Sequence, residues 1–408
     1  MHVLWDEPTK QLIAETRAFV KEDVPAELLR QMDREEVRFA ADFIRAAAER
    51  RLLGLRFPEQ YGGRGLPWTA EVAAIEEVGV LGTALGCNFV MPSIVGEALH
   101  AFGSEEQKRK YLGPIIRAEL LCAEALTEPR GGSDFFGATC SARRDGDHYV
   151  LRGQKRFIVG GEGADVFLVY ARTDPEARGR EAISAFIVER SERLQVEHLY
   201  GLMGTRGGGT ARIRLDDVRV PAANLIGPLN GGFRVFNRMM VPERMTSAAG
   251  AIGLGRAALE VATRYSDQRM AFGQKIRSFQ GVSFRVADSV SRLDAARSLL
   301  WVAALKADSG EDPRRLVSEA KRVCTQASWD TVNDAMQIMG GIGYTDVYPI
   351  ERLLRDARLS LIWTGSNEVM NLLIQHEYYK ELLAGGPPGR DVEGDALLAD
   401  GEEEKVFN

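Results

Sequence analysis

The stretch "VADSVSRLDAARSLLWVAALKADSG", Val286 to Gly310, has the periodicity of a long amphipathic helix. Its apolar positions recur in steps of three or four and so share one helix face: Val286, Val290, Leu293, Ala296, Leu300 and Ala304. Lys306 and Gly310 are typical of a helix end. A second long segment runs from Arg314 to Met339 and stops at Gly340-Gly341. Several long helices in succession predict an antiparallel bundle.

Towards the N-terminus the period changes from helical to two. In "TARIRLDDVRVP", Ala211, Ile213 and Leu215 alternate with arginines, as in a half-buried strand. The segments "ATCSARR" and "HYVLRG" flank Asp145-Gly146, which predicts a β-hairpin with a tight turn. The runs "ADVFLVYAR" and "AISAFIVER" suit buried strands. This part of the chain is predicted to be an antiparallel β domain inserted between helical domains.

The N-terminal part is again helical, with runs such as "ADFIRAAAERRLLGL" and "EVAAIEEVGVLG". We therefore expect a multi-domain α+β protein. The predicted units are a helical domain (1–121), a β domain (122–230), a helical bundle (231–383) and an acidic tail (384–408). The tail combines Gly, Pro and acidic residues without periodicity, and we expect it to be a mobile extension.

Charge and composition exclude several classes of function. Fifty-two basic and 58 acidic residues give a net charge of −6, which argues against bulk nucleic-acid binding. The first residues lack the pattern of a secretory signal, and no apolar run has the length of a membrane span, so we expect a cytoplasmic protein. The four cysteines and five histidines show no ligand spacing, so we predict no metal site and reduced, packed cysteines.

Two short motifs invite a cofactor interpretation. "GLGRAA", Gly253 to Ala258, fits the dinucleotide pattern, but no strand precedes it, and small residues at a close helix contact explain it better. "ALTEPRGGSD", Ala125 to Asp134, offers the hydroxyls of Thr127 and Ser133 and bare backbone N–H groups. This loop is suited to gripping a polar ring edge or an anion.

Five segments now establish a resemblance. They are "ALTEPRGGSD", "LRGQKRFIVGGEGADVFLVYART", "DDVRVPAANLIG", "RMAFGQKIRSFQ" and "AMQIMGGIGYTDVYPIERLLRDARL". In order and spacing they resemble the acyl-CoA dehydrogenase family, over nearly the whole chain except the acidic tail. The resemblance implies an N-terminal helical domain, a middle β domain and a C-terminal four-helix bundle. It also implies FAD, an acyl-CoA substrate, a homotetramer and a 2-enoyl-CoA product.

The resemblance assigns roles to residues. For the flavin ring it implies Leu126, Thr127, Ser133, Phe157, Ile158 and Val159. For the pyrophosphate and adenine of a neighbouring subunit's FAD it implies Arg269, Phe272, Gln280, Gln337, Gly340 and Gly341. Ser366 and Glu368 match further adenosine-side positions. Ser133, Arg244 and Thr364 are implied to contact the substrate.

Two positions depart from the family pattern. Val159 stands where many members have a threonine that hydrogen-bonds near flavin N5, and valine cannot donate. Thr364 stands where many members have the catalytic glutamate, although its backbone N–H remains available for the thioester oxygen. Glu368 and Glu128 are possible replacements for the base. Glu243 is favoured, because with Arg244 it resembles the pattern of isovaleryl-CoA dehydrogenase and some long-chain members.

The resulting hypothesis is an acyl-CoA dehydrogenase that uses Glu243 as base and passes its electrons to an electron-transfer flavoprotein. The displaced base favours a branched, cyclic or long acyl group. Two alternatives stay open on the same scaffold. One is a flavin oxidase or monooxygenase, which does not need the thioester-activating base, and the other is a non-catalytic protein that binds FAD or CoA.

Overall fold

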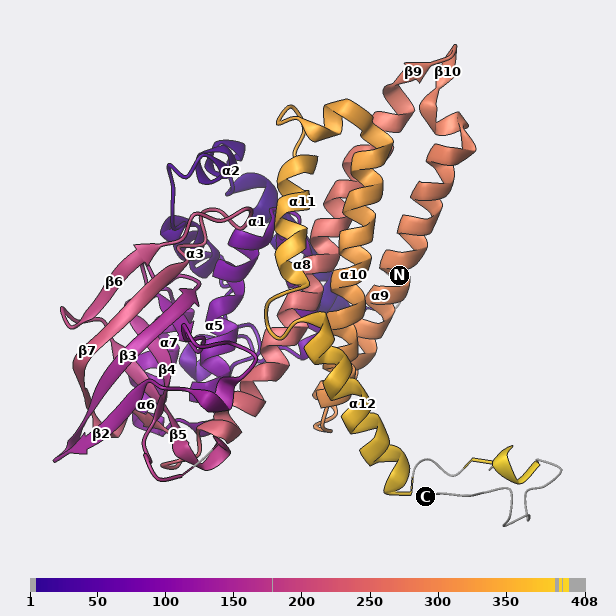
Figure 1. Cartoon of the computed structure of the whole chain (residues 1–408). Coiled ribbons are helices and arrows are strands. Elements are labelled where there is room, and N and C mark those ends of the chain that lie inside the picture. The colour runs from indigo at the N-terminus through magenta and orange to yellow at the C-terminus, as the bar shows by residue number, and fades with distance from the viewer. Residues whose placement is uncertain (1–4, 178, 386–388, 391, 396–408) are drawn as a thin grey trace.

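A computed structural model describes residues 5–177, 179–385, 389–390 and 392–395. It has three parts: N-terminal helices, a β-sheet, and a bundle of long helices whose far end carries a small hairpin (Figure 1). The predicted fold class is confirmed. Most of the tail predicted over 384–408 lies outside the described residues. Among the described helices, none is long and apolar enough to cross a membrane.

The N-terminal part is built around two buried helices. Its helices are α1 (Glu7–Glu22), α2 (Ala26–Asp33), α3 (Ala41–Glu49), α4 (Trp68–Gly79), α5 (Thr83–Phe102), α6 (Glu105–Gln107) and α7 (Gly113–Ile116). Asp6 caps α1 by accepting from the Thr9 N–H at 2.9 Å. Every residue of α4 is buried, and most residues of α5 are buried too. Helices that are buried on every side belong at the centre of a fold, and these two join the N-terminal helices to the bundle.

The sheet has the strand order β6-β7-β3-β2-β4-β5-β8, with β1 paired to β4. The strands are β1 (Cys122–Ala125), β2 (Ser141–Asp145), β3 (His148–Ile158), β4 (Val166–Arg172), β5 (Ile183–Glu189), β6 (Leu194–Leu199), β7 (Ala211–Pro221) and β8 (Leu225–Ile226). The predicted hairpin is confirmed, because Asp145 pairs with His148 across a turn that places Gly146 at φ +64°. Most strand pairs are antiparallel, as predicted, but β1 runs parallel to β4, and β2 also meets β4 in parallel at one residue pair. The long connection that holds the β2–β3 hairpin makes this parallel pairing possible.

The bundle consists of α8 (Gly232–Gln268), α9 (Gln280–Asp308), α10 (Arg314–Met339), α11 (Ile350–Ser360) and α12 (Asn367–Leu383). The short strands β9 (Met270–Ala271) and β10 (Gln274–Lys275) form the hairpin between α8 and α9. The bounds of α10 match the prediction. Along α9 the predicted core positions from Leu293 onward are buried, but Val290 is 44% exposed. This first half of α9 points towards the hairpin, away from the sheet (Figure 1).

The helices α4 and α8 cross at glycines. A Cβ on Gly253 would lie 2.1 Å from the carbonyl oxygen of Glu76, and one on Gly79 would lie 2.5 Å from the carbonyl oxygen of Gly250. No side chain fits between backbones this close. The "GLGRAA" segment is therefore part of a helix contact, as the sequence indicated, and lies in the middle of α8.

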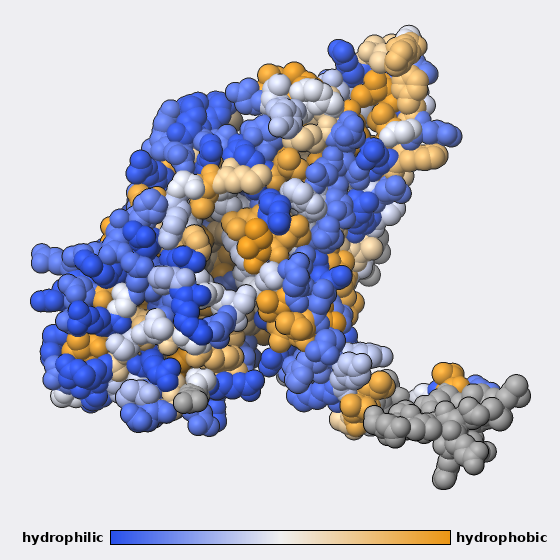
Figure 2. Space-filling model, in the orientation of Figure 1, coloured by the Kyte–Doolittle hydropathy of each residue, from blue (hydrophilic) through white to orange (hydrophobic). Residues whose placement is uncertain are grey.

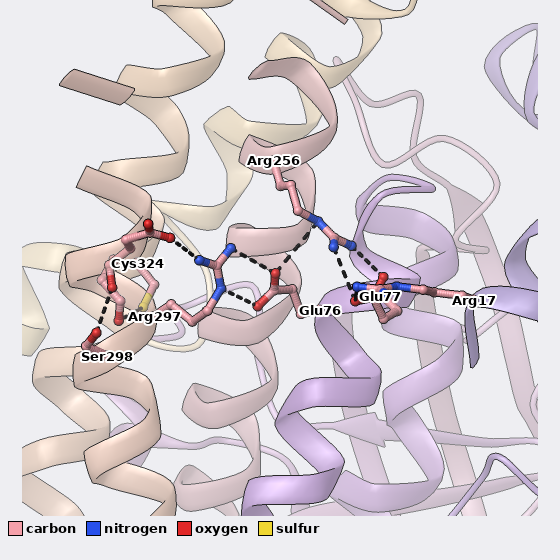
Figure 3. A network of polar contacts seen from close by, with 9 residues as sticks. Arg17, Glu76, Glu77, Arg256, Arg297, Ser298 and Cys324 are labelled. Carbon is pink, nitrogen blue, oxygen red and sulfur yellow. Dashed lines mark hydrogen bonds and ion pairs between the residues drawn. The ribbon is translucent and has the colours of Figure 1, made fainter. Parts of the chain in front are cut away.

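Next to this crossing, two adjacent glutamates of α4 connect three other helices (Figure 3). Glu76 accepts from Arg297 of α9 at 2.8 and 3.0 Å. Glu77 accepts from Arg256 of α8 at 2.7 Å and from Arg17 of α1 at 2.9 Å. Both carboxylates are buried, and each faces two arginines, since Arg256 also lies 3.7 Å from Glu76; these charge-assisted contacts offset the cost of desolvation.

A buried carboxylate of α11 connects all three parts of the chain. Asp356 accepts from the Thr83 N–H at the start of α5, at 2.8 Å. It also accepts from the Thr205 N–H, in the loop before β7, at 2.6 Å. Arg352, on the same helix, donates to the carbonyl oxygen of Leu81 at 3.0 Å. The bundle, the helical domain and the sheet therefore meet at one side chain.

The four cysteines are free and buried, as predicted. Burial raises the pKa of each thiol, well above its ordinary value for Cys87 and to about 11 for Cys140. These thiols are therefore protonated near neutral pH and pack as small apolar side chains. Within the described ranges, no group of three or more His, Cys, Asp or Glu is placed to hold a metal ion.

The glycine crossing predicts opposite effects for two alanine substitutions on one helix. Gly253→Ala would force its methyl against the backbone of Glu76 and should lower the free energy of unfolding by about 1–3 kcal/mol or more. The methyl group of Gly250→Ala would meet nothing within 4 Å. This variant should raise the free energy of unfolding by up to about 1 kcal/mol, because alanine has a higher helix propensity than glycine. Urea unfolding of both variants checks this. Equal effects in the two variants would contradict the contact.

The Asp356 junction predicts that an amide will not replace the carboxylate. Asp356→Asn keeps the shape but leaves one buried N–H facing an amide NH₂, so the free energy of unfolding should fall by about 1–3 kcal/mol. Asp346→Asn, which removes the same charge at an exposed site, is the control and should be neutral. The urea midpoint of each variant is the measurement. A neutral Asp356→Asn would show that the junction does not depend on this carboxylate.

Candidate active site

Glu243 lies on α8 directly after Pro242, a proline inside the helix. Pro242 has no N–H for the carbonyl oxygen one turn earlier, so the helix lacks a backbone hydrogen bond immediately before Glu243. The Glu243 side chain is partly buried on the side of α8 that faces the sheet and α5. There burial, and next the negative charge of Glu243, raise the pKa of Glu124 and of Cys87. In Figure 2 the surface between the sheet and the bundle is hollowed and bordered by an orange, hydrophobic patch.

A second carboxyl group, Glu124, lies against Glu243. Glu124 is in the middle of β1 and was not identified from the sequence. A signal was present, since it is the lone charged residue between Cys122 and Leu126, in a strand otherwise made of small and apolar residues. Oε1 of Glu124 is buried without a partner at hydrogen-bond geometry, and so is the hydroxyl of Tyr170 on β4.

The two carboxyl groups shift each other's pKa. Burial, and then the charge of Glu243, raise the pKa of Glu124 well above its ordinary value. Burial also raises the pKa of Glu243, whereas its interaction with Glu124 and the charge of Arg244 act in the opposite direction. In a pair of this kind the two protons are lost in two steps that belong to the pair rather than to either residue.

Arg244 is a buried cation beside Glu243, with 5% of its surface exposed. Burial, and then the nearby Arg314, lower its pKa to about 10. One guanidinium nitrogen, Nη1, donates to the hydroxyl of Ser318 at 3.2 Å, and Nε is buried without a partner among the described residues. The side chain is therefore able to bind an anionic or carbonyl group that reaches α8.

Thr364 lies next to the same side of α8. Its hydroxyl is 3.4 Å from that of Ser247, which follows Glu243 by one helical turn. Thr364 has φ +50°, and the loop is held to α10 by Lys321, whose ammonium donates to the Gly365 carbonyl at 2.8 Å and to Asn367 at 3.0 Å. Burial lowers the pKa of Lys321 to about 7. The loop between α11 and α12 therefore brings the backbone at Thr364 close to Glu243.

The other two candidate bases are placed differently. Glu368 is exposed in the first turn of α12, where Ser366 is the N-cap residue. Glu128 is buried and accepts four hydrogen bonds, from Lys155 and from the Thr139 and Cys140 backbone and the Thr139 hydroxyl, at 2.6–3.0 Å. Of the three, Glu243 is the carboxylate on α8, one helical turn before the Ser247 that Thr364 contacts.

The Glu128–Lys155 pair fixes the glycine-rich loop. Lys155 also donates to the carbonyl oxygen of Leu126 at 3.2 Å, and the Arg156 N–H donates to that of Thr127 at 2.9 Å. Thr127 is partly buried, and Ser133 is exposed further along the loop. The loop therefore joins β1, which carries Glu124, to the end of β3.

The end of β3 presents an aromatic side chain. Phe157 has φ +59° and is 49% exposed, and its ring lies 4.7 Å from that of Tyr200 and 4.9 Å from the Arg156 guanidinium. Ile158 is buried, and Val159 lines a small cavity with Phe39 and Met91. A half-exposed ring fixed by its neighbours is suited to supporting a flat heterocycle.

The remaining predicted cofactor residues lie at the other end of the bundle (Figure 1). This distal group contains Arg269, Phe272, Gln280, Gln337, Gly340 and Gly341. Along α8 the rise from Glu243 to Arg269 is roughly 39 Å. Phe272 is 94% exposed on the hairpin, and a Cβ on Gly340 or Gly341 would meet nothing within 4 Å. One chain therefore does not bring the two groups of cofactor residues together.

Comparison with known proteins covers the same three parts. Family models match residues 6–119 (Acyl-CoA dehydrogenase, N-terminal domain), 123–218 (Acyl-CoA dehydrogenase, middle domain) and 230–378 (Acyl-CoA dehydrogenase, C-terminal domain). An acyl-CoA dehydrogenase of Bacillus subtilis is 37% identical over 373 residues, covering 90% of this chain and 96% of its own.

Two further relatives extend the comparison. Subunit CarC of the caffeyl-CoA reductase–Etf complex of Acetobacterium woodii is 33% identical and covers 91% of this chain and 98% of its own. The structure of butyryl-CoA dehydrogenase from Megasphaera elsdenii superposes with a TM-score of 0.89 at 30% identity, covering 92% of this chain and 99% of the other. The chain belongs to the acyl-CoA dehydrogenase family, whose enzymes are oxidoreductases acting on CH–CH bonds.

Proposed function

We propose that the protein dehydrogenates an acyl-CoA thioester between its α and β carbons, with Glu243 removing the α-proton. The observation that carries this proposal is the position of Glu243, a partly buried carboxylate beside Arg244 and close to the loop of Thr364. An α-proton beside a thioester is weakly acidic, so the base has to be positioned and partly desolvated. The cofactor is FAD, which when bound accepts the hydride from the β carbon.

Thr364 and Arg244 then act on the substrate. The Thr364 backbone N–H stabilises the thioester oxygen as negative charge develops on it. A change from glutamate to threonine does not remove this donor. Arg244, with its free Nε, contacts the CoA arm, and Ser133 contacts substrate from the exposed part of the glycine-rich loop.

The cofactor residues support assembly as a homotetramer. Leu126, Thr127, Phe157, Ile158 and Val159, in the glycine-rich loop and at the end of β3, contact the flavin ring in this proposal, and Ser366 and Glu368, at the start of α12, contact its adenosine side. The distal group is too far away to bind the same FAD, so it serves the FAD of a neighbouring copy. Exposed apolar side chains on α9 and α12 offer a surface to such a copy: Phe284, Val302, Leu305, Leu372, Tyr379 and Leu382.

The substrate and the electron acceptor are narrower proposals. The displaced base favours a branched, cyclic or long acyl group. The electron acceptor is an electron-transfer flavoprotein, supported by the relative named as part of a caffeyl-CoA reductase–Etf complex. That relative is named a caffeyl-CoA reductase, which supports the reverse reaction, reduction of a 2-enoyl-CoA, as a second activity of the same site. The cytoplasmic location stays a prediction from the sequence.

The base assignment predicts the effect of one isosteric change. Glu243→Gln should reduce exchange of the substrate α-proton with deuterated water by about 10²–10⁴-fold and leave the flavin spectrum unchanged. Glu368→Gln, at the exposed alternative, is the matched control and should retain exchange. Anaerobic flavin bleaching with straight, branched and cyclic acyl-CoAs tests substrate choice in the same samples. Normal exchange in Glu243→Gln would overturn the assignment, and rapid oxygen use by the reduced flavin would favour an oxidase.

The sharing of cofactor residues between copies predicts complementation. Arg269→Ala alone should lose FAD, and Glu243→Gln alone should lose activity. In oligomers that contain both variants, an Arg269→Ala copy has an intact base, and its FAD is held by the intact Arg269 of its neighbour. Co-expression with two different affinity tags should therefore restore activity to doubly purified oligomers. Inactive mixed oligomers would contradict the sharing.

A further inference from the structure

Glu124 and Tyr170 point to the same side of the sheet. In the parallel pairing of β1 with β4, Glu124 lies opposite Leu168, and Tyr170 follows Leu168 by two residues. Leu168 and Tyr170 belong to the core that the sheet shares with the helices, whereas Ala123, Ala125 and Val169 face the other core. Glu124 therefore projects towards the helices, where α8 carries Glu243.

The surroundings of this polar group are mostly apolar. Phe135 and Phe236 stack with their centroids 4.2 Å apart, and Phe135 meets the ring of Tyr170 edge-on at 5.2 Å. Because Oε1 of Glu124 is shielded from solvent, an unpaired charge on it would be costly. Two unpartnered buried oxygens, Oε1 of Glu124 and the hydroxyl of Tyr170, therefore require an explanation.

Few other titratable or charged groups act on the two carboxyl groups. Cys87 of α5 faces Glu243 but is protonated, because burial raises its pKa well above the ordinary value. Lys155 of β3 attracts the charge of Glu124, and Arg244 of α8 attracts that of Glu243. Lys155 is already paired with Glu128 at 2.9 Å. The cation adjacent in sequence to Glu243 therefore favours placing the negative charge there.

We infer that Glu124 is a positioning residue for Glu243: the two facing carboxyl groups hold one proton, which stays on Glu124 and is donated as a hydrogen bond to the Glu243 carboxylate. The inference deepens the proposed function, because it rests on Glu243 as the base. The Tyr170 hydroxyl acts on Glu124 from the same face of the sheet.

This arrangement has a clear consequence for the reaction. One oxygen of Glu243 is held by Glu124, which leaves the other oxygen for the substrate. When the α C–H bond breaks, its proton forms a new O–H bond on Glu243, while the electron pair remains on the thioester enolate. Glu124 keeps its own proton throughout. A neutral partner thus keeps Glu243 ionised before the reaction without competing for the α-proton.

The pH dependence of kcat/KM tests the inference. Since Glu243 has to be ionised and burial raises its pKa, kcat/KM should fall as the pH falls through an acid limb above the ordinary glutamate range. Glu124→Leu removes the donor and should move this limb up by about one pH unit, lowering kcat/KM about tenfold on its acid side. Glu124→Gln keeps an N–H donor, so its acid limb should lie at the wild-type pH. Tyr170→Phe keeps Glu124 and should not move it.

Infrared difference spectra give a second measurement that does not depend on turnover. At neutral pH the wild-type protein should show the carbonyl band of a protonated carboxyl group, shifted in heavy water. The band should be absent from Glu124→Gln and present in Glu243→Gln. Its persistence in Glu124→Gln would place the proton elsewhere and overturn the inference.

The kinetic outcomes separate this inference from the proposed function. An unmoved acid limb in a Glu124→Leu variant with normal flavin content would refute the positioning role and leave Glu243 as the base. Loss of α-proton exchange in Glu124→Gln, together with normal exchange in Glu243→Gln, would make Glu124 the base and overturn both.

Discussion

One buried carboxylate fixes how the three parts of this chain are placed relative to one another. Asp356 accepts backbone hydrogen bonds at Thr83 and Thr205, and it does so where glycines let the chains approach. A Cβ on Gly82 would lie 2.7 Å from the Asp356 carboxylate, and one on Gly204 would lie 2.5 Å from the backbone of Arg355. The relative position of the sheet and the bundle, and hence the distance from the glycine-rich loop to α8, depends on this junction.

Two glutamates at the site, Glu128 and the partly buried Glu243, differ in the groups that surround them. Glu128 has Lys155 and several N–H and O–H donors, which together outweigh burial and lower its pKa. Glu243 faces another carboxyl group, and burial raises its pKa. The first glutamate is therefore a fixed structural anion, whereas the second is able to take up a proton. Glu128 lies in the glycine-rich loop and is anchored to β3 through Lys155, whereas Glu243 lies on α8 itself.

Local pattern predicted much of this fold. The helix at Arg314–Met339 and the turn at Asp145-Gly146 follow from short-range rules, and the ordered motifs led to the family. Local rules did not predict three other features: the parallel pairing of β1, the exposure of Val290 and the presence of Glu124 at the site. Each depends on what lies opposite the residue in space, and neither periodicity nor propensity specifies that. Motif positions indicated Glu243 and Thr364, whereas the facing carboxyl group was visible only as an isolated charge in an apolar strand.

The helix α8 couples the unfolding of the parts of the chain against which it packs. It is 37 residues long, begins beside β5, crosses α4 at Gly253 and ends beyond α10 at the hairpin. Its residues belong to the core that the N-terminal helices, one face of the sheet and the bundle share, and to a second core within the bundle, whereas the other face of the sheet has a core of its own. The family domains are therefore units of sequence rather than of stability. Loss of this helix would remove the sheet's helical cover and the bundle's central partner in one step, which ties the whole chain to one cooperative unfolding transition.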